Sequence, residues 1–270
     1  MASSNPAFSN SPAFTSSATK AAQLVRPAPP ELTAQQLTEL YSRPSATPAE
    51  TDRMSYEDTI VKIVVSFAIL LVGAVVGWFV PVLFLPAMIV GFVLALVNIF
   101  KKKPSPVLVL SYAAVEGVFV GGISMFFSQW YDGIVTQAVL GTLAVVGITL
   151  ALFASGKVRA SKKATKVFLI AMLGYVAFSL INMVLMLTGV TSGMFGLRSV
   201  EFFGIPLGAI IGVFVIVMAA YSLVLDFTSI KVGVERGAPR VYGWTAAFGI
   251  MVTVVWLYLE VLRLLAILRE

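Results

Sequence analysis

The chain has 270 residues, of which 59% are hydrophobic and 12% charged, and its mean hydropathy is +0.94 with a formal net charge of +6. This composition excludes an ordinary soluble domain, and the lack of cysteine and histidine excludes thiolate or imidazole metal sites, disulfides and Ser/His/Asp triads. The cations lie in separate loops between apolar stretches, so they do not form the continuous patch that nucleic acid requires.

Residues 1–55 form a first segment of different composition. Ser, Ala, Pro, Thr and Asn dominate it, and a short element recurs as Asn-Pro-Ala-Phe at residues 5–8 and Ser-Pro-Ala-Phe at residues 11–14. Such a segment buries too little apolar surface to order itself, so we predict a disordered cytoplasmic tail. It is not a secretory signal, because the first long apolar run starts only after Asp58.

Residues 56–270 are predicted to form a transmembrane domain. They contain seven apolar stretches, each of which, at about 1.5 Å per residue, is long enough to cross the roughly 30 Å hydrocarbon layer. Ser55 and Asp58 can cap the first helix, Pro81 ends it, and the lysine run at residues 101–103 ends the second. The predicted spans are residues 59–79, 82–100, 107–127, 135–154, 167–189, 205–230 and 243–268. The fold class is therefore an all-α membrane protein.

The distribution of cations predicts the orientation of this domain. The tail and the loops after spans two, four and six hold most of the 19 lysines and arginines. Cytoplasmic loops carry such an excess, so the amino terminus is expected in the cytoplasm. An odd number of spans then places the carboxyl terminus outside a plasma or inner membrane.

Glycines spaced four residues apart indicate where helices pack closely. They occur as two pairs and one triple, Gly73/Gly77, Gly117/Gly121 and Gly204/Gly208/Gly212. For the pairs, the alternative is that glycine is simply frequent in membrane helices. The triple is the more specific signal, and it predicts that span six packs tightly inside the bundle.

Three carboxylates lie within the spans, namely Glu116, Asp226 and Glu260. A carboxylate at membrane depth is costly unless it is paired, protonated or facing water, so these residues are candidates for an ion or proton site. Two alternatives stay open: a salt bridge from Glu260 to Arg263, and an exposed helix-end pair of Asp226 with Lys231. Glu116 has no cation close to it in sequence.

Polar residues at helical spacing form stripes on three spans. They are Tyr175, Ser179 and Asn182 on span five, Ser222, Asp226 and Ser229 on span six, and Thr253, Trp256, Glu260 and Arg263 on span seven. Stripes that converge inside a bundle line a hydrated pathway or form a buried network. The pathway-lining candidates are Tyr175, Asn182, Ser222 and Ser229.

Three segments carry a resemblance to the Bax inhibitor family. They are Ser-Tyr-Ala-Ala-Val-Glu-Gly at residues 111–117, Leu-Asp-Phe-Thr-Ser-Ile at 225–230 and Leu-Tyr-Leu-Glu at 257–260. The resemblance covers residues 55–270, and the chain is similar to bacterial transmembrane Bax inhibitor motif-like proteins. The Asn-Pro-Ala-Phe element of its tail resembles a variant found on bacterial members. It implies a seven-helix bundle with a central last helix, and a proton-sensitive calcium leak.

The resemblance also implies a pH sensor formed by Asp226 and Glu260, with Lys101 similar to a cation that pairs with the sensor in one conformation. Glu260 departs from the more usual aspartate, and the connection between the two acids is longer than in compact relatives. Counted along straight helices, the acids are roughly 20 Å apart. If they meet, they share a proton and titrate as a unit, and the freed oxygens suit a hard cation such as Ca²⁺.

Two other classes of function remain open on the sequence. One is a proton-coupled carrier of another solute, in which the acids bind the coupling proton. The other is a non-transporting regulator that binds a membrane protease or another membrane protein. We do not expect an enzyme, a cofactor or a resident metal, and the expected partners are the lipid bilayer and, for a regulator, a membrane protein.

Overall fold

The computed structural model describes residues 51–191 and 193–270, so the predicted disorder of residues 1–50 lies outside the described residues. The described chain contains seven long helices, and each is apolar enough to cross a membrane. They are α4 (Tyr56–Phe79), α5 (Phe84–Phe100), α6 (Pro106–Ser128), α7 (Ile134–Ala154), α8 (Lys162–Leu187), α9 (Leu207–Glu235) and α10 (Gly243–Ile267). The predicted all-α membrane class is confirmed.

Short elements connect the long helices. They are three 3-10 turns and one antiparallel strand pair, namely η2 (Pro81–Leu83), η3 (Gly196–Ser199), η4 (Arg240–Tyr242), β1 (Glu201–Phe202) and β2 (Ile205–Pro206). The strand pair was not predicted, because two-residue strands leave no periodic pattern. Its turn uses Phe203 and Gly204, both with positive φ, at 53° and 76°.

Two of the helix starts follow from local capping. The Ser55 hydroxyl accepts a hydrogen bond from the Asp58 amide at 3.2 Å, which satisfies one of the free amides at the start of α4. The Ser161 hydroxyl does the same for the Ala164 amide at 3.2 Å, so α8 begins within the segment predicted as a loop. Capping therefore extends this helix beyond the apolar stretch.

Glycine contacts join α4 and α6. The glycine pair at residues 73 and 77 lies against the α6 backbone, and the pair at residues 117 and 121 lies against the α4 backbone. An added Cβ at Gly117 would lie 2.9 Å from the carbonyl carbon of Leu70, so the two helices are as close as glycine permits. Both predicted pairs are thus true packing sites.

The predicted glycine triple is partly wrong. Gly204 lies in the strand turn, where an added Cβ would meet nothing within 4 Å. Gly208 and Gly212 do lie in α9 and face Ile267 and Leu264 of α10. Only two of the three glycines therefore form the α9 packing face.

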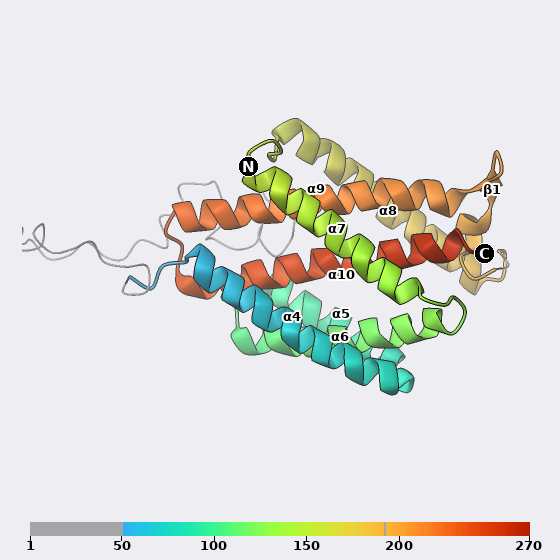
Figure 1. Cartoon of the computed structure of the whole chain (residues 1–270), viewed down its shortest axis with the longest axis horizontal. Helices are drawn as coiled ribbons and strands as arrows, with labels where there is room; N and C mark the ends of the chain where they lie inside the picture. The colour runs from blue at the N-terminus through green and yellow to red at the C-terminus, as the bar shows by residue number, and fades with distance from the viewer. Residues whose placement is uncertain (1–50, 192) are drawn as a thin grey trace, which may run out of the picture.

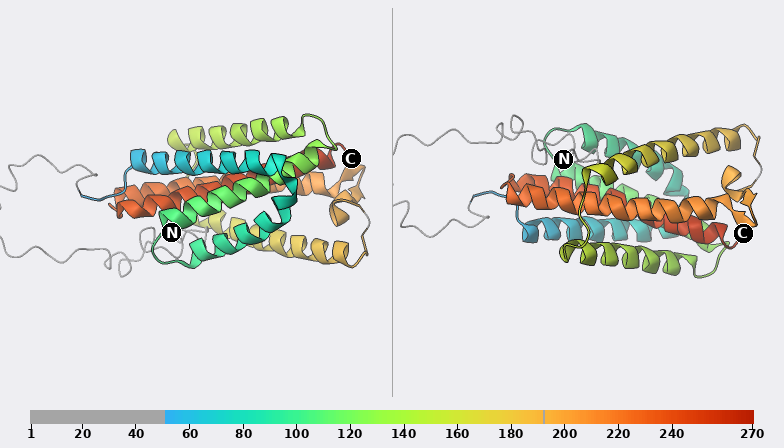
Figure 2. Two further views of the ribbon diagram at one scale, coloured as in Figure 1. Left: turned by 90° about the horizontal axis from the view of Figure 1, so that it is seen from below. Right: turned by 90° about the horizontal axis from the view of Figure 1, so that it is seen from above.

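The last helix is central. Figure 1 shows α10 running along the middle of the bundle, with α9 on one side and α4 on the other, and Figure 2 shows the same core position from two further directions. In the most apolar stretch of α10, 67% of the residues are buried, against 11% in the corresponding stretches of α5 and α8. The predicted central position of the last helix is confirmed.

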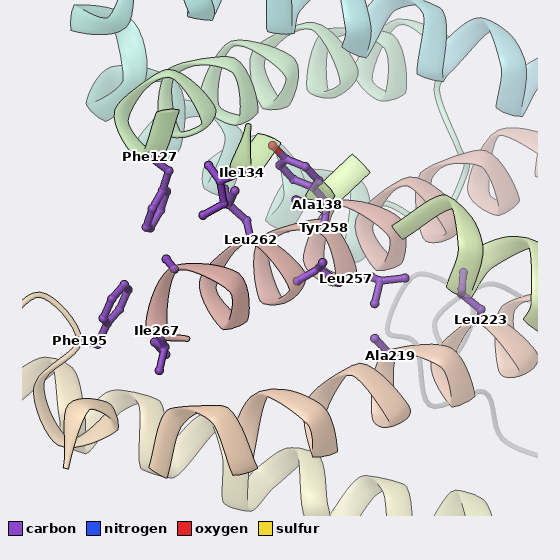
Figure 3. Packing of buried hydrophobic residues seen from close by; sticks show 12 residues of the cluster. Phe127, Ile134, Ala138, Phe195, Ala219, Leu223, Leu257, Tyr258, Leu262 and Ile267 are labelled. Carbon is purple, nitrogen blue, oxygen red and sulfur yellow. The ribbon is translucent and has the colours of Figure 1, made fainter. Parts of the chain in front are cut away.

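Apolar side chains of α10 reach its neighbours on opposite sides. Figure 3 shows Tyr258 and Leu262 of α10 directed towards Ile134 and Ala138 of α7, and the same cluster includes Leu223 of α9. Helices around this core expose apolar side chains outward, such as Leu71, Val72, Val75, Phe92 and Leu173, all more than half exposed. Such a surface fits a lipid environment.

The bundle has two ends, which we call the Asp58 end and the Arg198 end. At the Asp58 end, α4 and α10 begin and α9 ends. At the Arg198 end, α10 and the described chain end (Figures 1 and 2). Ser199 of η3 donates a hydrogen bond to the Glu270 carboxylate at 3.1 Å, which fixes the carboxyl terminus at the Arg198 end.

Candidate functional site

Asp226 lies between α9 and α10 and has no exposed surface. The Thr253 hydroxyl of α10 donates a hydrogen bond to its Oδ2 atom at 2.6 Å. The alternative pairing with Lys231 is wrong, because Asp226 is not exposed and the Lys231 ammonium pairs with Glu235 at 3.6 Å. Asp226 is therefore an interior acid at a helix contact.

The polar stripe on α9 faces the interior of the bundle. Ser222 and Ser229 are each only 8% exposed, on the same helix face as Asp226. The Ser229 hydroxyl donates to the carbonyl of Leu225 at 2.9 Å, so its hydrogen bond stays within its own helix. These two serines add buried hydroxyl groups above and below the acid.

Glu260 is a second interior acid, and it is paired with arginine. Its side chain is 2% exposed, and its Oε1 atom accepts hydrogen bonds from Arg263 Nη1 at 2.7 Å and from the Tyr175 hydroxyl. Its Oε2 atom faces Arg198 Nη1 at 3.8 Å. The Arg263 salt bridge that the sequence left open is present.

Arg198 is the residue that sequence reasoning missed. It belongs to η3 but turns inward, with only 4% of its surface exposed. Its Nη2 atom donates to the Tyr175 hydroxyl at 3.1 Å and to the Ser179 hydroxyl at 3.2 Å. The guanidinium also lies over the rings of Tyr175 and Phe178, 5.4 and 5.6 Å from their centroids. The only signal in the sequence is its apolar setting, between Phe195, Leu197 and Val200.

A cavity of about 540 Å³ opens beside these groups, between α8, η3 and α10. It is lined by Tyr175, Ser179, Asn182, Met183, Met186, Leu187, Met194, Phe195, Arg198, Trp256, Glu260 and Arg263. Asn182 also holds the loop, since its side chain donates to the Phe195 carbonyl at 3.2 Å and accepts from the Leu197 amide at 2.7 Å. The predicted stripes of spans five and seven meet in this cavity.

The two interior acids occupy separate sites. Thr253, the partner of Asp226, precedes Glu260 by seven residues on α10, which is roughly 10 Å of helix rise. Glu260 contacts the two arginines and Tyr175. In this conformation the two acids thus lie at separate places along the central helix.

Lys101 and Glu116 belong to the part of the bundle formed by α5 and α6. Lys101 is the exposed cap residue of α5, a helix that packs on α6. Glu116 lies on α6, one turn after Tyr112 on the same helix. A Cβ added at Gly91 of α5 would lie 3.0 Å from a Glu116 carboxylate oxygen, so Glu116 belongs to the α5–α6 contact.

Charged groups also join the start of α4 to the loop before α10. Asp58 pairs with Lys62 and, at 2.7 Å, with Arg240 Nη2, while the Lys62 ammonium donates to the Arg240 carbonyl at 2.6 Å. The Met54 amide donates to the Ala238 carbonyl at 2.6 Å. Residues 51–55, the described part of the predicted tail, therefore lie against the α9–α10 loop.

Among the described residues, no three acidic side chains gather as a set of metal ligands. Asp226, Glu260 and Glu116 each lie at a different helix contact.

Comparison with known proteins gives one match. A family model described as Bax inhibitor 1 like matches residues 5–270, nearly the whole chain. Searches of curated proteins and of solved structures each found nothing that matches.

Proposed function

The chain belongs to the Bax inhibitor 1 like family, and from this premise we propose that it is a pH-sensitive calcium leak in which Asp226 is the proton sensor. The observation that carries the proposal is the position of Asp226, without exposed surface at the contact of α9 with the central helix α10. We place it in the plasma membrane, with the Asp58 end in the cytoplasm and the carboxyl terminus outside.

The chemistry of the Asp226 site suits a proton switch. The Thr253 hydroxyl donates to the ionised carboxylate, and a hydroxyl can equally accept from the protonated acid, so either state keeps a hydrogen bond. Proton transfer nevertheless changes the local charge by one unit in a low-dielectric interior, where charges interact strongly. That change biases the packing of α9 against α10.

The two predicted sensor acids have different surroundings in this conformation. Glu260 is held by Arg263 at 2.7 Å, and Arg198 lies 3.8 Å from its other oxygen. Its charge is thus offset by arginine in this conformation. We therefore propose that Asp226, and not Glu260, is the proton sensor in this state, and that a direct pair with Glu260 forms only if α10 moves.

The test is calcium flux into proteoliposomes that contain a calcium-sensitive dye, measured across a pH series. We expect the wild-type flux to change with pH and the Asp226→Asn variant to give one flux at every pH, because an amide does not titrate. Glu235→Gln is the matched control, since Glu235 lies on the same helix but its side chain is 58% exposed; it should keep the wild-type profile.

Three outcomes would overturn parts of this proposal. A wild-type pH profile in Asp226→Asn would remove Asp226 as the sensor. Flux that depends on an added solute would indicate a coupled carrier. A folded wild-type protein that passes no calcium at any pH would refute the leak and favour the regulatory role.

A further inference from the structure

The cavity between α8 and α10 contains an excess of positive charge. The charged side chains in its lining are two guanidinium groups, Arg198 and Arg263, and one carboxylate, Glu260. The arginines remain protonated at all physiological pH values, so the ionised cluster carries one uncompensated positive charge. An isolated buried charge is costly, and interior charges are normally balanced by a partner.

Arg198 also lacks a full set of hydrogen bonds. Its Nη1 atom is buried and donates no hydrogen bond to the described protein, and Glu260 Oε2, 3.8 Å away, accepts none. Both atoms belong to residues that line the cavity. A water molecule could supply the missing hydrogen bonds, but it would leave the charge excess in place.

From these observations we propose that this cavity binds a phosphate group, and specifically the phosphodiester headgroup of a membrane phospholipid. A phosphodiester carries one negative charge, which matches the excess of the cluster. Guanidinium groups are the side chains best suited to phosphate, because their planar forks donate paired hydrogen bonds. The proposal does not depend on the calcium leak.

The rest of the cavity favours a lipid over free phosphate. Part of its wall is apolar and rich in methionine, with Met183, Met186 and Met194. Met183 is 50% exposed and Leu187 79% exposed, so this apolar wall reaches the outer surface of α8. An acyl chain can follow that wall while the headgroup meets the arginines.

The depth of the site also fits a headgroup. Arg263 is four residues from the end of α10, or roughly 6 Å along the helix axis. Its side chain is 33% exposed, which leaves part of the guanidinium accessible to a ligand. A position close to the end of a spanning helix is where lipid phosphates lie.

The experiment measures the thermal unfolding midpoint of the full chain in a neutral detergent with three additives: phosphatidylglycerol, inorganic phosphate and uncharged diacylglycerol. We expect phosphatidylglycerol alone to raise the midpoint, by roughly 5–10 °C at a hundredfold excess over its Kd. Arg263→Gln should lose most of that shift. Arg269→Gln is the matched control, because Arg269 is an exposed arginine at the same end of the bundle, bonded to Asp132 and Gln137 outside the cavity.

A second variant tests the proposal if Arg263→Gln does not fold. Met183→Trp fills the cavity at a half-exposed position and leaves the charges in place. It should also lose the lipid shift, and native mass spectrometry should show fewer bound phosphatidylglycerol molecules than on the wild-type protein. If inorganic phosphate raises the midpoint equally and Arg263→Gln abolishes that shift, the cavity binds phosphate, but the lipid is refuted as the source of that phosphate.

Two results would overturn the proposal. One is a phosphatidylglycerol shift that survives in both Arg263→Gln and Met183→Trp. The other is an equal loss of the shift in Arg263→Gln and Arg269→Gln, which would mean that the lipid responds to the general charge of this membrane face.

Discussion

The carboxylate of Glu260 offsets charge in the most polar part of the interior. It lies between Arg263 at 2.7 Å and Arg198 at 3.8 Å, and its side chain is 2% exposed. Removing one partner of a buried ion pair leaves the other charge uncompensated, which costs about 3–5 kcal/mol. We therefore expect Glu260→Gln to lower the free energy of unfolding by that amount, measured by denaturant titration in detergent micelles.

An exposed pair supplies the control for this prediction. Glu235 and Lys231 form an ion pair at 3.6 Å with side chains 58% and 40% exposed. Exposed pairs contribute about 0–1 kcal/mol, so Glu235→Gln should change the unfolding free energy by no more than that. Equal effects of the two substitutions would contradict the buried network.

At the residue scale, the sequence predicts contacts within one helix better than contacts between distant segments. Glu260 and Arg263 are three residues apart on one helix, so their pairing follows from spacing alone. The position of Arg198 depends on how η3 folds back over α8, which no local pattern encodes. Closeness in sequence suggested Lys231 for Asp226, but burial against α10 gave Thr253 instead.

Between helices, the space around a glycine differs from one glycine to another. A Cβ added at Gly117 would lie 2.9 Å from the carbonyl carbon of Leu70, whereas one added at Gly147 would meet nothing within 4 Å. Gly117→Ala must separate α4 from α6, and we expect it to destabilise the protein by about 1–3 kcal/mol. Gly147→Ala should be neutral or stabilise by up to about 1 kcal/mol, because alanine favours the helix.

Both values come from unfolding of the purified protein in one detergent. Similar destabilisation by the two substitutions would mean that helix formation, and not the α4–α6 distance, sets the outcome. Sequence spacing located this interface, since both glycine pairs fall on it. It failed at Gly204, because a four-residue repeat does not reveal that a strand turn comes before the helix.

Across the whole molecule, hydropathy predicted the spans but not their burial. The most apolar stretches of α8 and α10 have nearly equal mean hydropathy, 2.2 and 2.1, yet 11% of the first stretch and 67% of the second is buried. Lipid and protein interior are both apolar, so hydropathy does not distinguish them. The central place of α10 came from the family resemblance, and packing in the structure confirms it (Figure 1).

With α5, α8 is one of the two least buried of the described spans. Hydrogen bonds hold it at a few points: Thr165 with the Tyr221 hydroxyl at 3.0 Å, Tyr175 with Arg263 Nη1 at 3.1 Å, and Asn182 with the Leu197 amide at 2.7 Å. Local opening depends on such contacts and on packing. We therefore expect backbone amides of α8 to exchange hydrogen faster than those of α10 in detergent, as followed by mass spectrometry.

We expect the Asn182 contacts to couple the local opening of α8 to that of η3. Asn182 is 7% exposed and bonds to both the Phe195 carbonyl and the Leu197 amide, so Asn182→Ala leaves two backbone groups unpaired at a cost of about 1–3 kcal/mol each. Exchange in α8 and η3 should rise roughly tenfold or more, while α10 stays unchanged. Thr188→Ala is the control, because the exposed Thr188 hydroxyl bonds only within its own helix end. An equal rise in α10 would show that α8 opens only when the whole bundle unfolds.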